Sequence, residues 1–184
     1  MTRPAFPPLT DDSWPEAARD LRDGFAGKLN VYRVMAHHPA LLNAWAPLRA
    51  HVVVDNVLGK QFSEVVILRT GVHLGSSYEW NHHVSRGRAC GMSDARIASI
   101  KGAPDGMEPD DATFARAVDE LFTDKRLTPE TQTALMALVG REGVFDVIAT
   151  VGFYSTLGYI LNSCDTPLDA NVAAELEAQP LAAT

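Results

Sequence analysis

Acid, base and thiol side chains share one face of a helix expected over residues 78–90. At 100° per residue, an arc of about 100° holds Glu79, His82, His83, Arg86 and Cys90, with Ser76 at its edge. A carboxylate one helical turn from an imidazole forms a workable acid–base pair, because each group shifts the pKa of the other toward neutrality. The same pattern also suits a solvated polar face, so the spacing alone leaves both interpretations open.

A further carboxylate, Glu64, lies in the apolar segment that precedes this helix. The run EVVILRTGVHLG over 64–75 is longer than an ordinary strand, and it indicates a buried helix. Glu64 shares a face of that helix with Ile67 and Leu68, and apolar surroundings favour the protonated form of a carboxyl group. Alternatively, Ser63 caps the helix and Glu64 only stabilises the positive end of the helix dipole.

The segments SEVVILR at 63–69 and GSSYEWNHH at 75–83 carry a recognisable pattern. They resemble the carboxymuconolactone decarboxylase family, which includes the alkylhydroperoxidase D (AhpD) proteins. The family pattern is a glutamate, eleven residues, a first cysteine, two residues, a second cysteine, three residues and a histidine. Glu64 and His83 keep that spacing. The resemblance implies an all-α, AhpD-like fold in a homo-oligomer, commonly built from trimers, with the site near subunit contacts.

The sequence departs from this pattern at both cysteines. Ser76 stands at the position of the first cysteine and Glu79 at that of the second. A thiol peroxidase needs one thiolate to attack the peroxide and a second thiol to resolve the sulfenic acid. Cys90 lies on the same helix face but has no neighbouring thiol in the sequence. Alkylhydroperoxidase activity is therefore disfavoured, and the chain resembles the cysteine-free branch, whose named chemistry is cofactor-free decarboxylation of a small lactone acid.

Decarboxylation next to an unsaturated lactone leaves a dienolate, which requires a hydrogen-bond donor at the oxyanion and an acid that protonates carbon. Under this hypothesis Glu79 and His83 are the proton-transfer pair, and Glu64 orients or reprotonates His83. The predicted substrate-binding residues are Ser76, Tyr78, His82, Arg86 and Arg69, with an arginine holding a substrate carboxylate. We predict a carboxy-lyase that acts on a small lactone or unsaturated organic acid without a cofactor.

Two other classes of function remain open at this point. Residues 79–82 form a Glu-x-x-His, which is half of a di-iron carboxylate site, and Glu64, His82 and His83 are an alternative ligand set for Zn²⁺. The sequence has no second Glu-x-x-His, so we predict no metal. A non-catalytic helical oligomer or binding protein would instead leave the face around Glu79 solvated, with ordinary pKa values.

Composition limits the partners. The chain has 184 residues and a net charge of -7, whereas a protein that binds nucleic acid backbones usually carries clustered basic charge. The opening residues lack the pattern of a signal peptide, and no run approaches the roughly 18 uninterrupted apolar residues of a membrane span. Cys90 and Cys164 are far apart and form no CxxC. We expect a cytoplasmic protein whose partner is a small-molecule substrate, not a nucleic acid or a membrane.

Sequence signals for the starts and ends of helices recur along the chain, and signals for strands do not. We therefore expect the candidate site residues to lie on a scaffold of helices. Residues 1–184 are expected to form one all-α domain of two loosely repeated halves, with an extended arm at 1–12 and a tail with a short helix at 163–184. Prolines at 39 and 47 should divide the apolar stretch 31–56 into two or three pieces. A long apolar helix is expected near 144–161.

Overall fold

The computed structural model describes residues 5–181, and this part of the chain contains α-helices, short 3₁₀ and π turns and no strand. The helices are α1 (Arg19–Asp23), α2 (Asn30–Met35), α3 (Pro39–Ala50), α4 (Lys60–Leu74), α5 (Ser77–Ala89), α6 (Asp94–Ser99), α7 (Pro109–Thr123), α8 (Pro129–Ser163) and α9 (Ala170–Ala178). The predicted all-α fold is confirmed.

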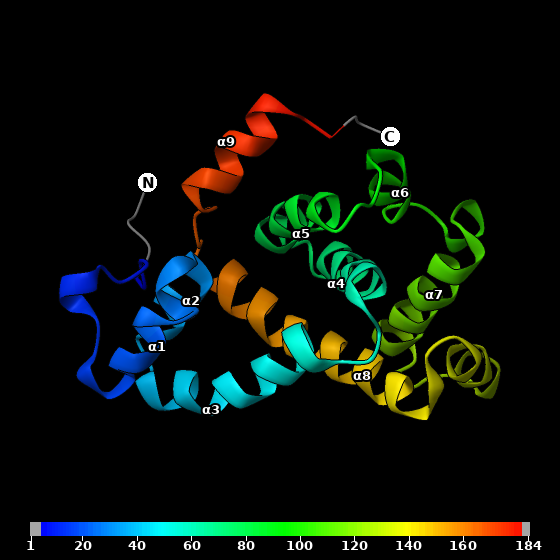
Figure 1. The fold of residues 1–184 in the computed structure, drawn as a ribbon, viewed down its shortest axis with the longest axis horizontal. Coiled ribbons are helices and arrows are strands. Elements are labelled where there is room, and N and C mark those ends of the chain that lie inside the picture. Colours follow the sequence, from blue (N-terminus) through cyan, green and yellow to red (C-terminus); the bar gives the residue numbers. More distant parts are fainter. Residues whose placement is uncertain (1–4, 182–184) are drawn as a thin grey trace.

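Helix α4 lies at the centre of the bundle, where it packs against α5, α7 and α8 (Figure 1). Every residue from Ser63 to Gly71 is buried, including the charged Glu64 and Arg69, because other helices pack around this one. The expectation that Ser63 caps this helix is wrong. Gly59 is the N-cap, with a φ of 75° that a glycine adopts readily, and the helix therefore starts one turn earlier at Lys60. Glu64 is consequently an interior helix residue.

The two prolines of the stretch before α4 have different effects. Pro39 occupies the first position of α3, where its missing N–H costs nothing. Pro47 lies inside α3 without dividing it, and the chain continues into a π-helical turn, η4 (His51–Asp55). This turn carries valines that reach the interior of the bundle.

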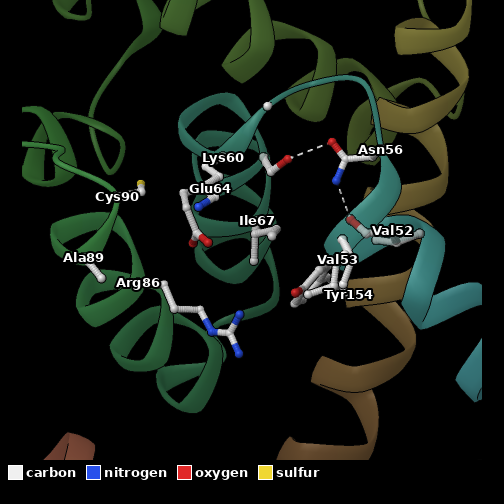
Figure 2. Close-up of a pocket in the computed structure, with 13 residues that line it drawn as sticks. Val52, Val53, Asn56, Lys60, Glu64, Ile67, Arg86, Ala89, Cys90 and Tyr154 are labelled. Carbon is white, nitrogen blue, oxygen red and sulfur yellow. Dashed lines mark hydrogen bonds between the residues drawn. The ribbon is translucent and has the colours of Figure 1, made fainter. Parts of the chain in front are cut away.

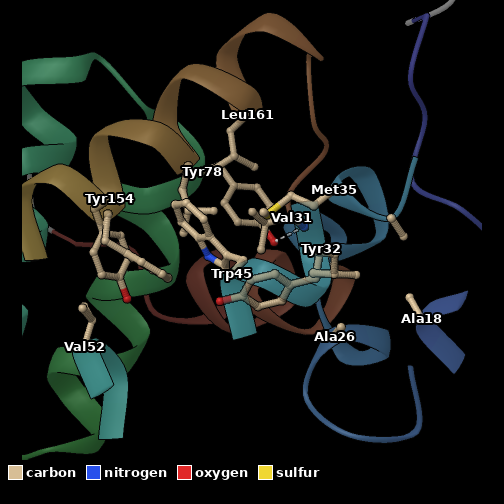
Figure 3. Close-up of a cluster of buried hydrophobic side chains, with 14 of the residues drawn as sticks. Ala18, Ala26, Val31, Tyr32, Met35, Trp45, Val52, Tyr78, Tyr154 and Leu161 are labelled. Carbon is tan, nitrogen blue, oxygen red and sulfur yellow. Dashed lines mark hydrogen bonds between the residues drawn. The ribbon is translucent and has the colours of Figure 1, made fainter. Parts of the chain in front are cut away.

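Two apolar clusters hold the helices together. The first joins α2, α3, α5 and α8 and includes Ile67 of α4, and Figure 3 shows Trp45, Tyr32, Tyr78 and Tyr154 gathered in it. The Trp45 and Phe153 rings stack with centroids 4.4 Å apart. The second cluster joins α4 to α6, α7 and α8. Helix α4 therefore contributes to both cores, which fixes the rotation of its polar residues.

Helix α8 is two helices joined at Gly140. The φ of 71° and ψ of -177° at this glycine lie outside the helical region, and the segment after it contains the apolar helix expected near 144–161. By length and composition α8 could cross a membrane, but 56% of its most apolar window is buried against the other helices. That burial is the pattern of a core helix in a soluble protein.

The two ends of the chain run beside the bundle. Within the predicted arm, residues 1–4 lie outside the described residues, and a 3₁₀ turn, η1 (Asp11–Ser13), follows. Within the predicted tail, α9 packs on α5, and residues 182–184 lie outside the described part. The remaining short turns are η2 (Glu16–Ala18), η3 (Ala26–Lys28) and η5 (Pro104–Gly106).

Candidate active site

Three of the predicted residues form one buried chain of acid and base groups. The Nδ1 atom of His83 lies 2.5 Å from Oε2 of Glu64, and its Nε2 atom lies 3.4 Å from Oε2 of Glu79. Glu64 is 9% exposed, and Glu79 and His83 are each 3% exposed. An imidazole between two buried carboxylates can pass a proton from one side to the other.

The turn between α4 and α5 places these groups opposite one another. Gly75 adopts the left-handed conformation that ends α4, with a φ of 58°. The Ser76 side chain then accepts a hydrogen bond from the backbone N–H of Glu79 and caps α5. Because only these two residues join the helices, α5 folds back along α4, and His83 comes to lie beside Glu64.

The two carboxylates control the charge of His83. Burial lowers the pKa of His83, but Glu64 and then Glu79 raise it by Coulomb attraction and hydrogen bonding, and the net pKa lies above its ordinary value. The edge of the imidazole also meets the Tyr154 ring, with centroids 5.1 Å apart. The two neighbouring acids therefore favour the protonated form of His83.

A cavity of about 370 Å³ opens next to Glu64. Figure 2 shows the Glu64 carboxylate and the Cys90 thiol on one side, Arg86 on another and Tyr154 with the η4 valines across from them. Most of the wall is apolar, and the cationic groups Lys60 and Arg86 also line it. The volume and the mixed lining suit a small organic anion.

The two carboxylates face different spaces. Glu64 borders the large cavity, whereas Glu79 and His83 border a pocket of about 20 Å³, which has room for about one water molecule. Arg86 and Tyr154 line both spaces. The sequence hypothesis made Glu79 and His83 the reacting pair with Glu64 behind them. In the structure, Glu64 is the carboxylate that borders the larger of these two spaces.

His82, the neighbour of His83, points away from this chain of groups. Its Nε2 atom lies 2.9 Å from Oδ2 of Asp169, and the same oxygen accepts a hydrogen bond of 2.5 Å from the Tyr78 hydroxyl. The backbone N–H of Asn30 donates to Oδ1 at 3.0 Å. Burial raises the pKa of Asp169, but these hydrogen bonds outweigh burial and lower it. Tyr78 and His82, predicted to bind substrate, are thus engaged in joining α5 to α2 and α9.

Arg69 is also engaged elsewhere. Its guanidinium forms a two-bond ion pair with Asp119, with both N–O distances 2.7 Å, and donates to the carbonyls of Ile100 and Gly102. The structure does not bring Arg69 to the cavity, where Arg86 is the arginine present. Arg69 instead ties α4 to α7.

The ligand set proposed for Zn²⁺ is not assembled, because His82 and His83 turn to different carboxylates. Within residues 5–181, no group of three or more histidine, cysteine or acidic side chains is arranged to hold a metal ion. Cys90 lines the cavity, where burial, and then the neighbouring Glu64, raise its pKa and favour the neutral thiol over the nucleophilic thiolate.

Three residues of the site were not assigned from the sequence. Tyr154 and Lys60 line the cavity, and Asp169 orients α5. Tyr154 and Asp169 lie more than 70 residues from the Glu64–His83 segment, so helical periodicity within that segment could not find them. Lys60 lies one turn before Glu64, at the N-terminus of α4. The sequence analysis expected that helix to start later, after Ser63.

Helix order and packing define the fold as that of AhpD-like all-α proteins. The AhpD core of a peroxidase-related protein from Ralstonia eutropha JMP134 matches with a TM-score of 0.78 and 15% identity, covering 94% of this chain and 95% of that one. The debrominase Bmp8, as a cysteine-to-alanine variant in complex with 2,3,4-tribromopyrrole, matches with a TM-score of 0.73 and 14% identity over 95% and 96% of the two chains. No protein-family model and no curated protein matches the sequence.

Proposed function

We propose that this protein is a carboxymuconolactone decarboxylase-like enzyme that uses cofactor-free acid–base chemistry on a small lactone or unsaturated organic acid. The observation that carries the proposal is the Glu64 carboxylate, which borders a cavity of about 370 Å³ and is hydrogen-bonded at 2.5 Å to a buried His83. A buried carboxylate coupled to an imidazole is costly to maintain and is typical of proton-transfer sites.

The cavity wall supports an acidic substrate. Arg86 and Lys60 line it, and Arg86 takes part in none of the arginine ion pairs found within residues 5–181. In the proposed complex, Arg86 binds a substrate carboxylate, and the valines of η4 and Ile67 enclose the carbon skeleton. The net charge of -7 on the chain makes such local cations necessary for anion binding.

The proposed reaction proceeds in two steps. The bond between the ring carbon and the carboxylate breaks, its electron pair enters the conjugated lactone as a dienolate, and carbon dioxide leaves. The proton then passes from the His83 imidazolium through the Glu64 carboxyl group to the ring carbon. His83 recovers a proton from solvent through Glu79 and the small pocket, so the cycle consumes one proton.

Tyr154 supplies the donor for the dienolate oxygen in this scheme. Its ring lines the cavity next to Glu64, and burial, with the nearby carboxylates, raises its pKa well above the ordinary value, so the hydroxyl keeps its proton. Figure 2 shows the Tyr154 hydroxyl on the side of its ring that faces the cavity, where it can donate to a substrate. A fixed donor at a developing oxyanion is worth roughly 3–4 kcal/mol in the transition state.

The test is turnover of 4-carboxymuconolactone, followed by lactone absorbance and carbon dioxide release, with and without a metal chelator. We expect chelator-resistant turnover that His83→Asn abolishes while the variant keeps its helical circular dichroism. Turnover that disappears with chelator would point to a metal enzyme. Absence of turnover with this lactone and with a panel of small unsaturated acids would contradict the proposal.

A non-catalytic binding protein is the alternative, and the mostly apolar cavity is the observation that favours it. That function predicts binding of a small acid, measured by calorimetry, without any chemical change. Residual alkylhydroperoxidase activity is disfavoured, because Ser76 and Glu79 carry no thiol and Cys90 is held as a neutral thiol. A cytoplasmic location and a trimer-based homo-oligomer stay predictions.

A further inference from the structure

One wall of the cavity beside Glu64 is made by the π-helical turn η4 (His51–Asp55). Its valine wall, formed by Val52, Val53 and Val54, lines the cavity with three consecutive side chains. Val52 is buried and Val54 is exposed, so the wall reaches from the interior of the bundle to the surface. A single turn of helix is not stable on its own, so contacts with the rest of the bundle must hold this wall in place.

Asp146 of α8 holds both ends of the valine wall. Its Oδ1 atom lies 2.7 Å from Nε2 of His51, the first residue of η4. Its Oδ2 atom accepts a hydrogen bond of 2.8 Å from the backbone N–H of Val57, which follows the turn. Asp146 is only 6% exposed, and a hydrogen bond is stronger where water is excluded. One buried carboxylate therefore ties the start of the wall and the residue after it to α8.

The valine wall is also tied to α4, through Asn56. The Nδ2 atom of Asn56 donates to the carbonyl oxygen of Val52 at 2.7 Å, and its Oδ1 atom accepts from the Ser63 hydroxyl at 3.1 Å (Figure 2). Asn56 thus fixes the wall relative to α4, whereas Asp146 fixes it relative to α8. Tyr154, across the cavity from the wall, is a residue of α8. The Asp146 contacts therefore set the separation between the wall and Tyr154.

From these contacts we propose that Asp146 is a positioning residue, which holds the valine wall at the distance from Tyr154 that fits the carbon skeleton of the substrate. This role rests on the proposed function, since it assumes that a substrate fills the cavity. Asp146 does not line the cavity and acts through η4. Its two hydrogen bonds carry the role. An amide in the same place can keep both, because its oxygen accepts from Val57 and its nitrogen donates to an unprotonated Nε2 of His51.

The test compares steady-state kinetics on 4-carboxymuconolactone for the wild type, Asp146→Ala and Asp146→Asn. Asp146→Ala should raise KM by about tenfold, the effect of losing an apolar contact the size of one methylene group. Its kcat should change by less than about twofold, because the wall contacts the substrate equally in the ground state and the transition state. Asp146→Asn should keep the KM of the wild type. The matched control is Asp119→Ala, which removes the partner of Arg69 and His73 between α4 and α7 and should leave KM unchanged.

His51→Ala tests the same wall if Asp146→Ala does not fold. The His51 side chain is 52% exposed, so its removal leaves no buried space and the variant should fold. It should also raise KM, but by a smaller factor than Asp146→Ala, since the hydrogen bond to Val57 remains. An unchanged KM in His51→Ala and in every folded Asp146 variant would overturn the proposal, and so would an equal rise in KM for Asp119→Ala.

Binding of benzoate, measured by calorimetry, separates this proposal from the proposed function. Benzoate offers an apolar ring to the valine wall and a carboxylate to Arg86, and it needs no turnover. Asp146→Ala should weaken its binding by about tenfold, as for the substrate. If the wild type binds benzoate more tightly than Asp146→Ala but leaves the lactone unchanged, the proposed function fails and the role of Asp146 stands. A wild type that neither binds benzoate nor converts the lactone would overturn both.

Discussion

Asp169 holds α5 in the orientation that the site requires, and replacing it with asparagine should be destabilising. Its Oδ2 atom accepts from both Tyr78 and His82, which flank Glu79 and His83 on α5, while Oδ1 accepts from the backbone of Asn30. The amide keeps the Oδ1 acceptor but replaces Oδ2 with a nitrogen that cannot accept. Two hydrogen bonds to a charged group, each worth about 1.5–3 kcal/mol, are then lost, with partial recovery where the new N–H donates to the Tyr78 oxygen. We expect a loss of about 2–4 kcal/mol in the free energy of unfolding.

Urea denaturation, followed by circular dichroism, measures this loss, with Glu175→Gln as the control. Glu175 also joins α9 to α5, through Ser85, but this hydrogen bond is exposed, so its removal should cost less than about 0.5 kcal/mol. Because the folded-state pKa of Asp169 is lowered, its stabilisation is present at neutral pH and is lost as pH falls through that pKa. The difference between wild type and Asp169→Asn should therefore shrink in acid. Equal effects of Asp169→Asn and Glu175→Gln would refute the assigned role.

Three further predictions follow from single residues. Glu64 and Glu79 raise the pKa of His83, so the stabilisation from the His83 charge is complete below its ordinary pKa of 6.5 and is lost as the pH rises through its folded-state pKa. Urea denaturation at a series of pH values from 6 upward should show this fall in the free energy of unfolding for the wild type and not for His83→Asn. Tyr154→Phe should lower kcat by several hundredfold, roughly the 3–4 kcal/mol of one donor, with a change in thermal stability of only a few degrees, and an unchanged kcat in steady-state assays would remove its hydroxyl from the mechanism. Gly140→Ala should destabilise the protein by about 1–2 kcal/mol in urea denaturation, because its φ of 71° strains any residue with a Cβ, and a neutral result would mean that the kink relaxes.

The local parts of the site could be predicted from the sequence, because helical periodicity fixes which side chains share a face. The spacing from Glu64 to His83 placed both groups on adjoining helices, and Gly75 with Ser76 marked the turn that brings them together. The mostly apolar run after Ser63 predicted a buried helix, which the structure confirms. These features depend on residues within about twenty positions of one another.

The remaining features depend on contacts between distant parts of the chain. Whether His82 or His83 faces the site was decided by Asp169, which takes the His82 ring and lies 87 residues away. Arg69 is held by Asp119, a partner that periodicity cannot identify. Glu64, not Glu79, meets the large cavity, because η4 and α8 close that side of the bundle. Side-chain partners across the bundle therefore determined which polar residues are structural and which are available to a ligand.

The proposed role of Glu64 as the acid that meets the substrate is tested most directly by comparing kcat for Glu64→Gln and Glu79→Gln with the wild type on 4-carboxymuconolactone. Glu64→Gln should lower kcat by about a hundredfold or more with KM nearly unchanged, because the amide cannot deliver the proton. Glu79→Gln should also lower kcat, but less, since Glu79 acts through His83 from the far side. A Glu64→Gln variant that keeps wild-type kcat would contradict the account.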